Sequence, residues 1–278
     1  MNARALWAIA RRDLTGVRRS RAIMTPLLVI PLGFLVLLPG LVSLLPAMGG
    51  DDPQAARAFG QLMTALPAEA RAALASGFAD TGASYEQKWL LLVHTQLFPP
   101  LFLLVPFMVA NVIAADSFAG ERERQTLEAL LYTPPTDAEL FAGKVLAAAV
   151  PALSVSLLGF LLYYGVVTAV GEAAYGWHPP FSAASLVLAT WVGPAFAAFG
   201  LAAMVAVSLR VQRTQDAVQV GGLFILPLIG LVVSAVKGAV VLRAGTLALI
   251  GAVTWALALV LLRAGVRSFR RARLVGRL

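Results

Sequence analysis

The sequence contains no cysteine, only two histidines and few charged residues. The absence of cysteine excludes disulfides, thiolate metal sites and a cysteine nucleophile. The two histidines and the acids form no motif of a metal site or of a general acid and base. Charged residues make up 13% of the chain, about half of the ~25% found in soluble domains. We therefore expect a chain that is not an enzyme and has no catalytic residue, metal or cofactor of its own.

The chain is instead rich in long apolar runs. Hydrophobic residues make up 59% of the chain, and its mean hydropathy is +0.82. A helix that crosses the ~30 Å hydrocarbon core of a bilayer needs about 20 residues, and the alternation typical of membrane strands is not found. The sequence therefore predicts an all-α membrane protein in which residues 1–278 form a single transmembrane domain. Its six spans are expected at about 23–45, 89–113, 145–170, 184–208, 218–235 and 245–262.

None of the six expected spans contains Asp, Glu, Lys or Arg. This disfavours an ion-driven carrier, because such proteins keep a charged residue inside the membrane for their work. His94, in the second span, is expected to be a hydrogen-bonded packing residue rather than a proton relay. Pro99-Pro100 and Gly193-Pro194 are candidate sites of kinking or close helix packing.

Basic residues indicate how the chain lies in the membrane. Most of the 22 Lys and Arg residues fall before the first span, between spans two and three, between spans four and five, and after span six. The positive-inside rule places such segments in the cytoplasm. We expect a multi-pass protein of the cell membrane with both termini cytoplasmic. The net charge of +8 then reflects topology and attraction to anionic lipid headgroups, and nucleic acid is not expected as a partner.

Residues 1–21 have the pattern of an interfacial amphipathic helix. Leu6, Trp7, Ala10, Leu14 and Val17 recur at helical spacing, and Trp7 is the expected anchor. The arginines expected to meet lipid phosphates are Arg11, Arg12, Arg18 and Arg19. The alternative is that these arginines act only as a topology signal.

Two further segments lie outside the expected spans. Residues 46–88 contain Ala-rich helical patterns broken at Pro67 and are expected to form an external helical cap, which either gates a pathway or packs on the bundle. Residues 263–278 are expected to form a basic cytoplasmic tail.

The loop at residues 114–144 is the only dense group of charges between two long apolar segments. Asp116 or Ser117 is expected to cap the start of a short helix, and Pro134-Pro135 to end it. Leu127, Leu130 and Leu131 would share one face of that helix. Thr136 and Glu139 form a capping box for the helix of the third span. The prediction is a surface helix tied at each end to a transmembrane helix.

Residues 111–146 resemble the signature loop of type-2 ABC exporter permeases. The matching parts are a G-E-R-E segment, a T-L-E-x-L-L core, a proline and a G-K pair at Gly143-Lys144. Gln125 and Pro135-Thr136-Asp137 depart from that family's usual residues. The resemblance implies a coupling helix that docks on an ATPase subunit. Its docking residues would be Gly120, Glu121, Arg122, Glu123, Thr126, Leu127, Glu128, Leu130 and Leu131.

The resemblance also implies partners. The chain has no G-x-x-x-x-G-K-[ST] phosphate loop, since Gly143-Lys144 is followed by Val145. ATP and Mg would therefore bind to a separate ABC ATPase subunit, and two ATPase copies call for a homodimer or a heterodimer with a related permease. The weakly polar membrane interior favours a hydrophobic or amphipathic cargo. The alternatives are a membrane-embedded enzyme of lipid metabolism and an ATP-independent carrier or channel.

Overall fold

The computed structural model describes residues 3–49, 84–124, 136–208, 213–237 and 239–268, together with Val211 and scattered positions between 54 and 72. Every regular element in this part of the chain is a helix, which confirms the predicted all-α class. Most of the expected external cap at residues 46–88, most of the expected coupling helix and the end of the basic tail lie outside the described residues.

The described helices form six groups along the chain. The N-terminal helix α1 (Ala3–Arg19) precedes the first of them. The first three groups are α2 (Arg21–Leu32), η1 (Gly33–Leu37) and α3 (Leu38–Gly49); α6 (Tyr85–Leu92), η2 (Val93–Leu97), α7 (Phe98–Ala115), η3 (Asp116–Gly120) and α8 (Glu121–Glu123); and α10 (Asp137–Tyr175). The last three are α11 (Ala183–Val187), η4 (Leu188–Val192) and α12 (Gly193–Ser208); α13 (Thr214–Gly222), η5 (Leu223–Ile225) and α14 (Leu226–Val236); and α15 (Ala244–Ser268).

Each of the six groups contains a continuous helical stretch that is long and apolar enough to cross a membrane, as predicted. They run from 23 to 48, 85 to 120, 138 to 175, 183 to 208, 214 to 235 and 244 to 265. The second and third are longer than expected, because helix continues past the apolar residues at both ends. These two helices therefore include polar residues at both ends of their apolar runs.

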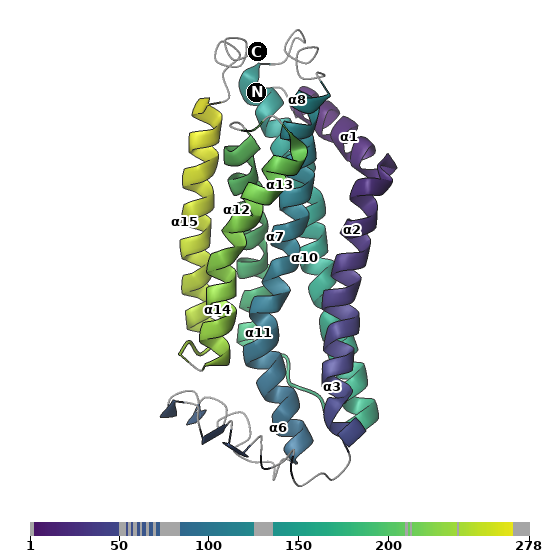
Figure 1. Cartoon of the computed structure of the whole chain (residues 1–278), viewed down its shortest axis with the longest axis vertical. Coiled ribbons are helices and arrows are strands. Elements are labelled where there is room, and N and C mark those ends of the chain that lie inside the picture. Colours follow the sequence, from purple (N-terminus) through teal and green to yellow (C-terminus); the bar gives the residue numbers. More distant parts are fainter. Residues whose placement is uncertain are drawn as a thin grey trace.

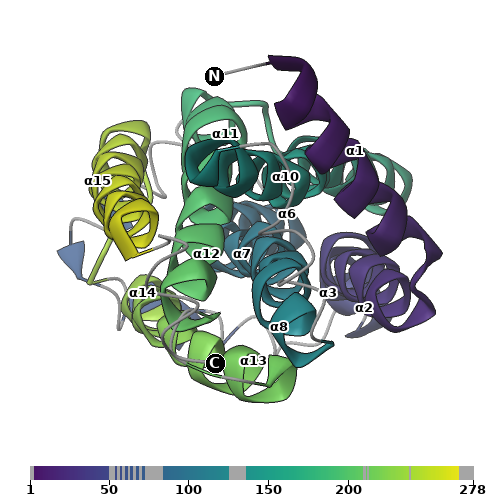
Figure 2. The same cartoon turned by 90° about the horizontal axis from the view of Figure 1, so that it is seen from above.

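Spans two and four form the centre of the bundle (Figures 1 and 2). In each of them 72% of the most apolar stretch is buried inside the protein, against 17–33% of that stretch in the other four spans. Their helices α7 and α12 approach closely at Gly200, where an added Cβ would lie only 2.6 Å from the carbonyl oxygen of Phe107. The outer helices expose large apolar side chains such as Leu28, Leu161 and Leu249. A surface of this kind suits contact with lipid.

Proline and glycine distort the central spans where the sequence suggested kinking. The π-helical turn η2 ends just before Phe98-Pro99, and η4 ends just before Gly193-Pro194. Proline lacks the N–H that would bond four residues back, and a π-turn absorbs that loss. Both pairs therefore lie beside irregular helix, and an added Cβ at Gly193 would clash with Ser156, which confirms close packing there. Kinking at the two places stays a prediction.

The helix of span two does not restart at Asp116 or Ser117, and the prediction of a helix cap there was wrong. The backbone N–H of Asp116 bonds to the carbonyls of Ile113 and Val112, so the residue lies inside a helix. The chain continues through the π-turn η3 into α8. An N-cap is needed only where backbone N–H groups have no helical partner, and here they have one.

The helix of span three starts where predicted. Thr136 Oγ1 accepts a hydrogen bond from the Glu139 N–H at 3.3 Å, and Glu139 Oε2 accepts one from the Thr136 N–H at 3.0 Å. This capping box opens α10, which continues to Gly176. Gly176 has φ 60°, a left-handed conformation that ends a helix readily because glycine has no Cβ.

The N-terminal helix α1 lies across one end of the bundle (Figure 2). Its buried residues Ala10 and Val17 face the protein, while Trp7 is 58% exposed. The apolar stripe seen in the sequence is thus used partly for packing within the chain, and Trp7 lies off the packed face. The position of α1 at a membrane surface stays a prediction.

We call the end of the bundle formed by α1, α8 and the first turns of α10 and α13 the charged end, and the opposite end, with α6, α11 and the start of α15, the far end (Figure 1). His94 lies in the far half and is buried. Its two ring nitrogens lie 2.9 Å from Ser43 Oγ and 2.9 Å from Tyr163 Oη. The prediction of a hydrogen-bonded packing histidine is confirmed.

Candidate functional site

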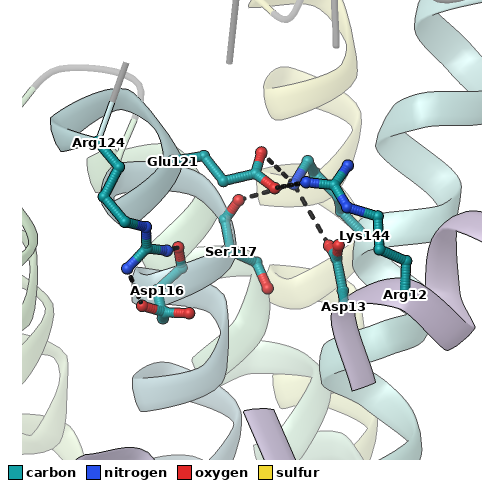
Figure 3. A network of polar contacts seen from close by, with 7 residues as sticks. All are labelled: Arg12, Asp13, Asp116, Ser117, Glu121, Arg124 and Lys144. Carbon is teal, nitrogen blue, oxygen red and sulfur yellow. Dashed lines mark hydrogen bonds and ion pairs between the residues drawn. The ribbon is translucent and has the colours of Figure 1, made fainter. Parts of the chain in front are cut away.

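The charged end contains a buried lysine that joins three separate parts of the chain (Figure 3). Lys144 lies about two turns into α10, and its side chain is 1% exposed. Its Nζ lies 3.3 Å from Asp13 Oδ2 in α1 and 2.5 Å from Glu121 Oε2 in α8, and it donates to the Ser117 carbonyl in η3 at 2.9 Å. One ammonium group thus ties α1, α8 and α10 together.

A fourth charge completes this group. Arg12 Nη2 lies 3.5 Å from Glu121 Oε1, and the Arg12 side chain remains 54% exposed. We call Arg12, Asp13, Glu121 and Lys144 the ionic network. It contains two cations and two carboxylates, so its formal charge is balanced. Balance matters because an uncompensated buried charge is strongly destabilising.

Burial acts directly on Glu121. Loss of solvent raises the pKa of the Glu121 carboxyl, and the nearby Lys144 opposes that shift. The Glu121 side chain is only 8% exposed. Its carboxylate therefore depends on its cationic neighbours inside the protein to remain charged.

Gly143 explains how α1 comes close enough to reach Lys144. A Cβ added at Gly143 would lie 2.8 Å from the side chain of Ile9 and 3.3 Å from the carbonyl oxygen of Leu6. Any larger residue would separate α1 from α10. The Gly143-Lys144 pair therefore provides a close helix contact and the cation that the contact encloses.

A second set of contacts holds the turn between α7 and α8. Arg124 Nη1 donates to Asp116 Oδ1 at 3.0 Å, and this bond raises the pKa of Arg124. An added Cβ at Gly120 would lie 2.9 Å from Asp116 Oδ1, 3.0 Å from Arg124 Nη2 and 3.3 Å from Thr214 Oγ1. Glycine leaves the space in which these three side chains meet.

Glu123 connects α8 to the start of span five. Its Oε2 accepts hydrogen bonds from the Thr214 backbone N–H at 2.9 Å and from the Thr214 hydroxyl at 2.7 Å. The N-cap residue of α13, Arg213, forms no side-chain cap hydrogen bond. Helix N-termini have N–H groups without helical partners and favour negative charge. Glu123 thus caps α13 from another helix, and these bonds hold the pKa of its carboxyl below the usual range.

The Glu123 cap should depend on pH. Because the folded-state pKa is lowered, the tie is present above the ordinary glutamate pKa and is lost as pH falls through the lowered value. We expect Glu123→Gln to reduce the hydrogen-exchange protection of the Thr214 amide at neutral pH, whereas the unmodified chain loses it only in acid. Exchange of residues 214–217, measured by mass spectrometry, checks this. The matched control is Glu172→Gln, which replaces an exposed acid near the far end and should leave the protection of Thr214 unchanged. Unchanged protection in Glu123→Gln would contradict the assignment of Glu123 as the cap of α13.

The structure brings some of the residues predicted from the sequence into contacts, leaves others exposed and does not describe the rest. Glu121 and Arg12 meet in the ionic network, and Glu123 caps α13. Arg11, Arg18 and Arg19 are exposed along α1. The side chain of Arg122 and the predicted docking residues Thr126, Leu127, Glu128, Leu130 and Leu131 lie outside the described part of the chain.

Sequence reasoning missed three residues of this region. Lys144 was read only as part of a G-K pair, and Asp13 and Thr214 were not singled out. Asp13 lies on α1 among arginines, and its sequence neighbours gave no signal. Lys144 directly precedes an apolar run, a place where a charge has a cost. That cost was the available signal, since a buried charge needs a partner.

The arrangement is a junction of charged and polar side chains between helices. The described residues contain no group of three or more His, Cys, Asp or Glu able to hold a metal. The side chains of α8 instead contact α1, α10 and α13.

The fold and this junction define an integral membrane protein whose charged end links several spans. The family model of the ABC-2 family transporter protein matches residues 7–267, nearly the whole chain. The chain belongs to this family of transporter membrane proteins. Comparison with curated proteins found no match.

Proposed function

We propose that this chain is the permease subunit of an ATP-driven ABC exporter and that the segment following α8 is its coupling helix. The observation that carries the proposal is the pair of contacts made by α8: Glu121 to Lys144 of α10, and Glu123 to Thr214 of α13. A partner that moved this segment would move the ends of spans two, three and five together. Family membership supports the transport role.

The proposal assigns different roles to the residues of the predicted docking set. Leu127, Leu130 and Leu131 would supply the apolar contact with an ATPase subunit, because their spacing would place them on one face of a helix. Glu121 and Glu123 would instead hold the start of the segment in place through their contacts within the chain. Gly120 would leave room for Asp116, Arg124 and Thr214.

The ATPase subunit would bind ATP and Mg, and closure of two such subunits around nucleotide would supply the movement. The charged end would then face the cytoplasm, in agreement with the distribution of Arg and Lys. Two permease chains, identical or related, would form the transport unit. A hydrophobic or amphipathic cargo fits the weakly polar spans, and α1 with Trp7 would lie at the lipid headgroups.

Purification from the native membrane tests the docking role. We expect the unmodified chain to co-purify with an ABC ATPase in mild detergent and the Leu127→Asp variant to lose it, because a carboxylate in an apolar contact must be desolvated without a partner. Proteins that co-purify are identified by mass spectrometry and quantified against the permease.

The matched control is Ala239→Asp, which introduces the same charge in an exposed loop at the far end. It should retain the ATPase. Equal recovery of the ATPase with Leu127→Asp and with the control would contradict docking through this segment. Full transport activity of the chain alone would favour an ATP-independent carrier or channel.

A further inference from the structure

The far end contains a cavity of about 370 Å³, well separated along the bundle from the ionic network. It is lined by the start of span two, the second half of α10, α11 with η4, and the segment that leads into α15. Known ligand sites measure about 300–1,000 Å³ and are mostly apolar with a few placed polar groups. The size and the walls of this cavity match that description.

Aromatic side chains form one wall and are held in place by their own contacts. The rings of Phe160 and Tyr164 are stacked at 6.3 Å, and those of Tyr164 and Phe181 meet edge to face at 5.3 Å. The Tyr164 hydroxyl donates to the Pro179 carbonyl at 3.2 Å. Tyr163 is held by His94 at 2.9 Å. The wall is therefore preformed, which lowers the entropy cost of binding an apolar group.

The lining of the cavity also includes a cation. Arg243 lines the cavity and is exposed, just before the first turn of α15. It forms no ion pair with any acid of the described residues, although Asp and Glu elsewhere in that part of the chain do pair. Gln96 Oε1 accepts a hydrogen bond from the Leu242 N–H at 3.1 Å and fixes the segment that presents Arg243.

We propose that this cavity binds an amphiphile with a single anionic head, a carboxylate or a phosphate, next to Arg243 and an apolar chain against the aromatic wall. A guanidinium group binds both kinds of anion through paired hydrogen bonds. Leu188 and Leu247 complete an apolar interior that suits an alkyl chain. A ligand that is polar throughout is disfavoured, because part of it would lose its hydration against these apolar side chains.

Photolabelling of the purified full-length chain tests the site. The probe is dodecanoic acid with a terminal diazirine, added to nanodiscs of phosphatidylcholine, and labelled peptides are identified by mass spectrometry. We expect saturable labelling of residues 160–167 and 182–188. Arg243→Gln should raise the half-saturating concentration about tenfold, the usual effect of losing a hydrogen bond to a charged group.

Three further comparisons make the result specific. Lys237→Gln removes the other cation of the same loop, which does not line the cavity, and should leave labelling unchanged. Diazirine-bearing dodecanol should show no difference between Arg243→Gln and the unmodified chain. Ala184→Phe, which places a ring in the cavity, should abolish saturable labelling while the melting temperature stays within a few degrees.

Unsaturable labelling, labelling outside the two segments, or an equal effect of Lys237→Gln would overturn the proposal. An arm with phosphatidylglycerol in the nanodiscs separates two sources of the ligand. Displacement of the probe by phosphatidylglycerol assigns the site to a bilayer lipid, and retention of the probe assigns it to a free amphiphile. The experiment uses no ATPase, so its outcome is independent of the proposed docking.

Discussion

Replacing Lys144 with methionine is expected to destabilise the protein by about 3–5 kcal/mol, the cost of removing one partner from a buried ion pair. Methionine keeps the length and apolar body of lysine but removes the ammonium group. Asp13 and Glu121 would then lie side by side with almost no solvent, since their side chains are 7% and 8% exposed. Thermal unfolding in detergent, followed by near-ultraviolet circular dichroism, measures the loss.

Lys237→Met is the matched control for this change, because Lys237 is an exposed lysine in a loop. Its melting temperature should stay close to that of the unmodified chain. Adding Asp13→Asn and Glu121→Gln to Lys144→Met should restore part of the lost stability, since the two buried carboxylates that lost the ammonium group would become neutral. Equal melting temperatures of Lys144→Met and Lys237→Met would show that the network contributes little.

Replacing Gly143 with leucine is expected to move α1 away from α10. The Cβ alone would meet the side chain of Ile9 at 2.8 Å, and overpacking of this kind costs about 1–3 kcal/mol. The separation would also weaken the Asp13–Lys144 pair. Because the chain has no native cysteine, a single Ala10→Cys reports the movement. Ala10 is 0% exposed, so maleimide should react slowly with that cysteine and faster when Gly143→Leu is added.

Gly165→Leu is the control on the same helix. A Cβ at Gly165 meets no atom within 4 Å, so this leucine should leave the reactivity of Ala10→Cys unchanged. If Ala10→Cys reacts at the same rate with Gly143→Leu as with Gly165→Leu, the position of α1 does not depend on the close contact at Gly143. Hydrogen exchange across residues 10–17 offers an independent measurement of the same separation.

Several parts of the fold could be predicted from the sequence because their causes are local. The length of an apolar run decides whether a helix can cross a bilayer, and all six spans were found. The capping box of Thr136 and Glu139 needs only residues three apart. Pro99 and Pro194 disturb the helix just before them through their own rings and missing N–H groups.

The course of the chain between α7 and α8 could not be predicted in the same way. Asp116 has the side chain of a good cap, and its sequence neighbours do not distinguish a helix start from a helix interior. Arg124, eight residues later, binds the Asp116 carboxylate instead. The conformation was decided by which partner this carboxylate finds in the folded protein.

The sequence by itself determined the class of the protein, its six spans and the charged segment between spans two and three, because hydrophobic length and local capping are properties of contiguous residues. Only the tertiary structure decided what those charges contact. Lys144 pairs with Asp13, 131 residues away in the chain, and Glu123 caps Thr214, 91 residues away. The strength of an ion pair depends on distance through space and on exclusion of water, and neither quantity exists until the helices have packed.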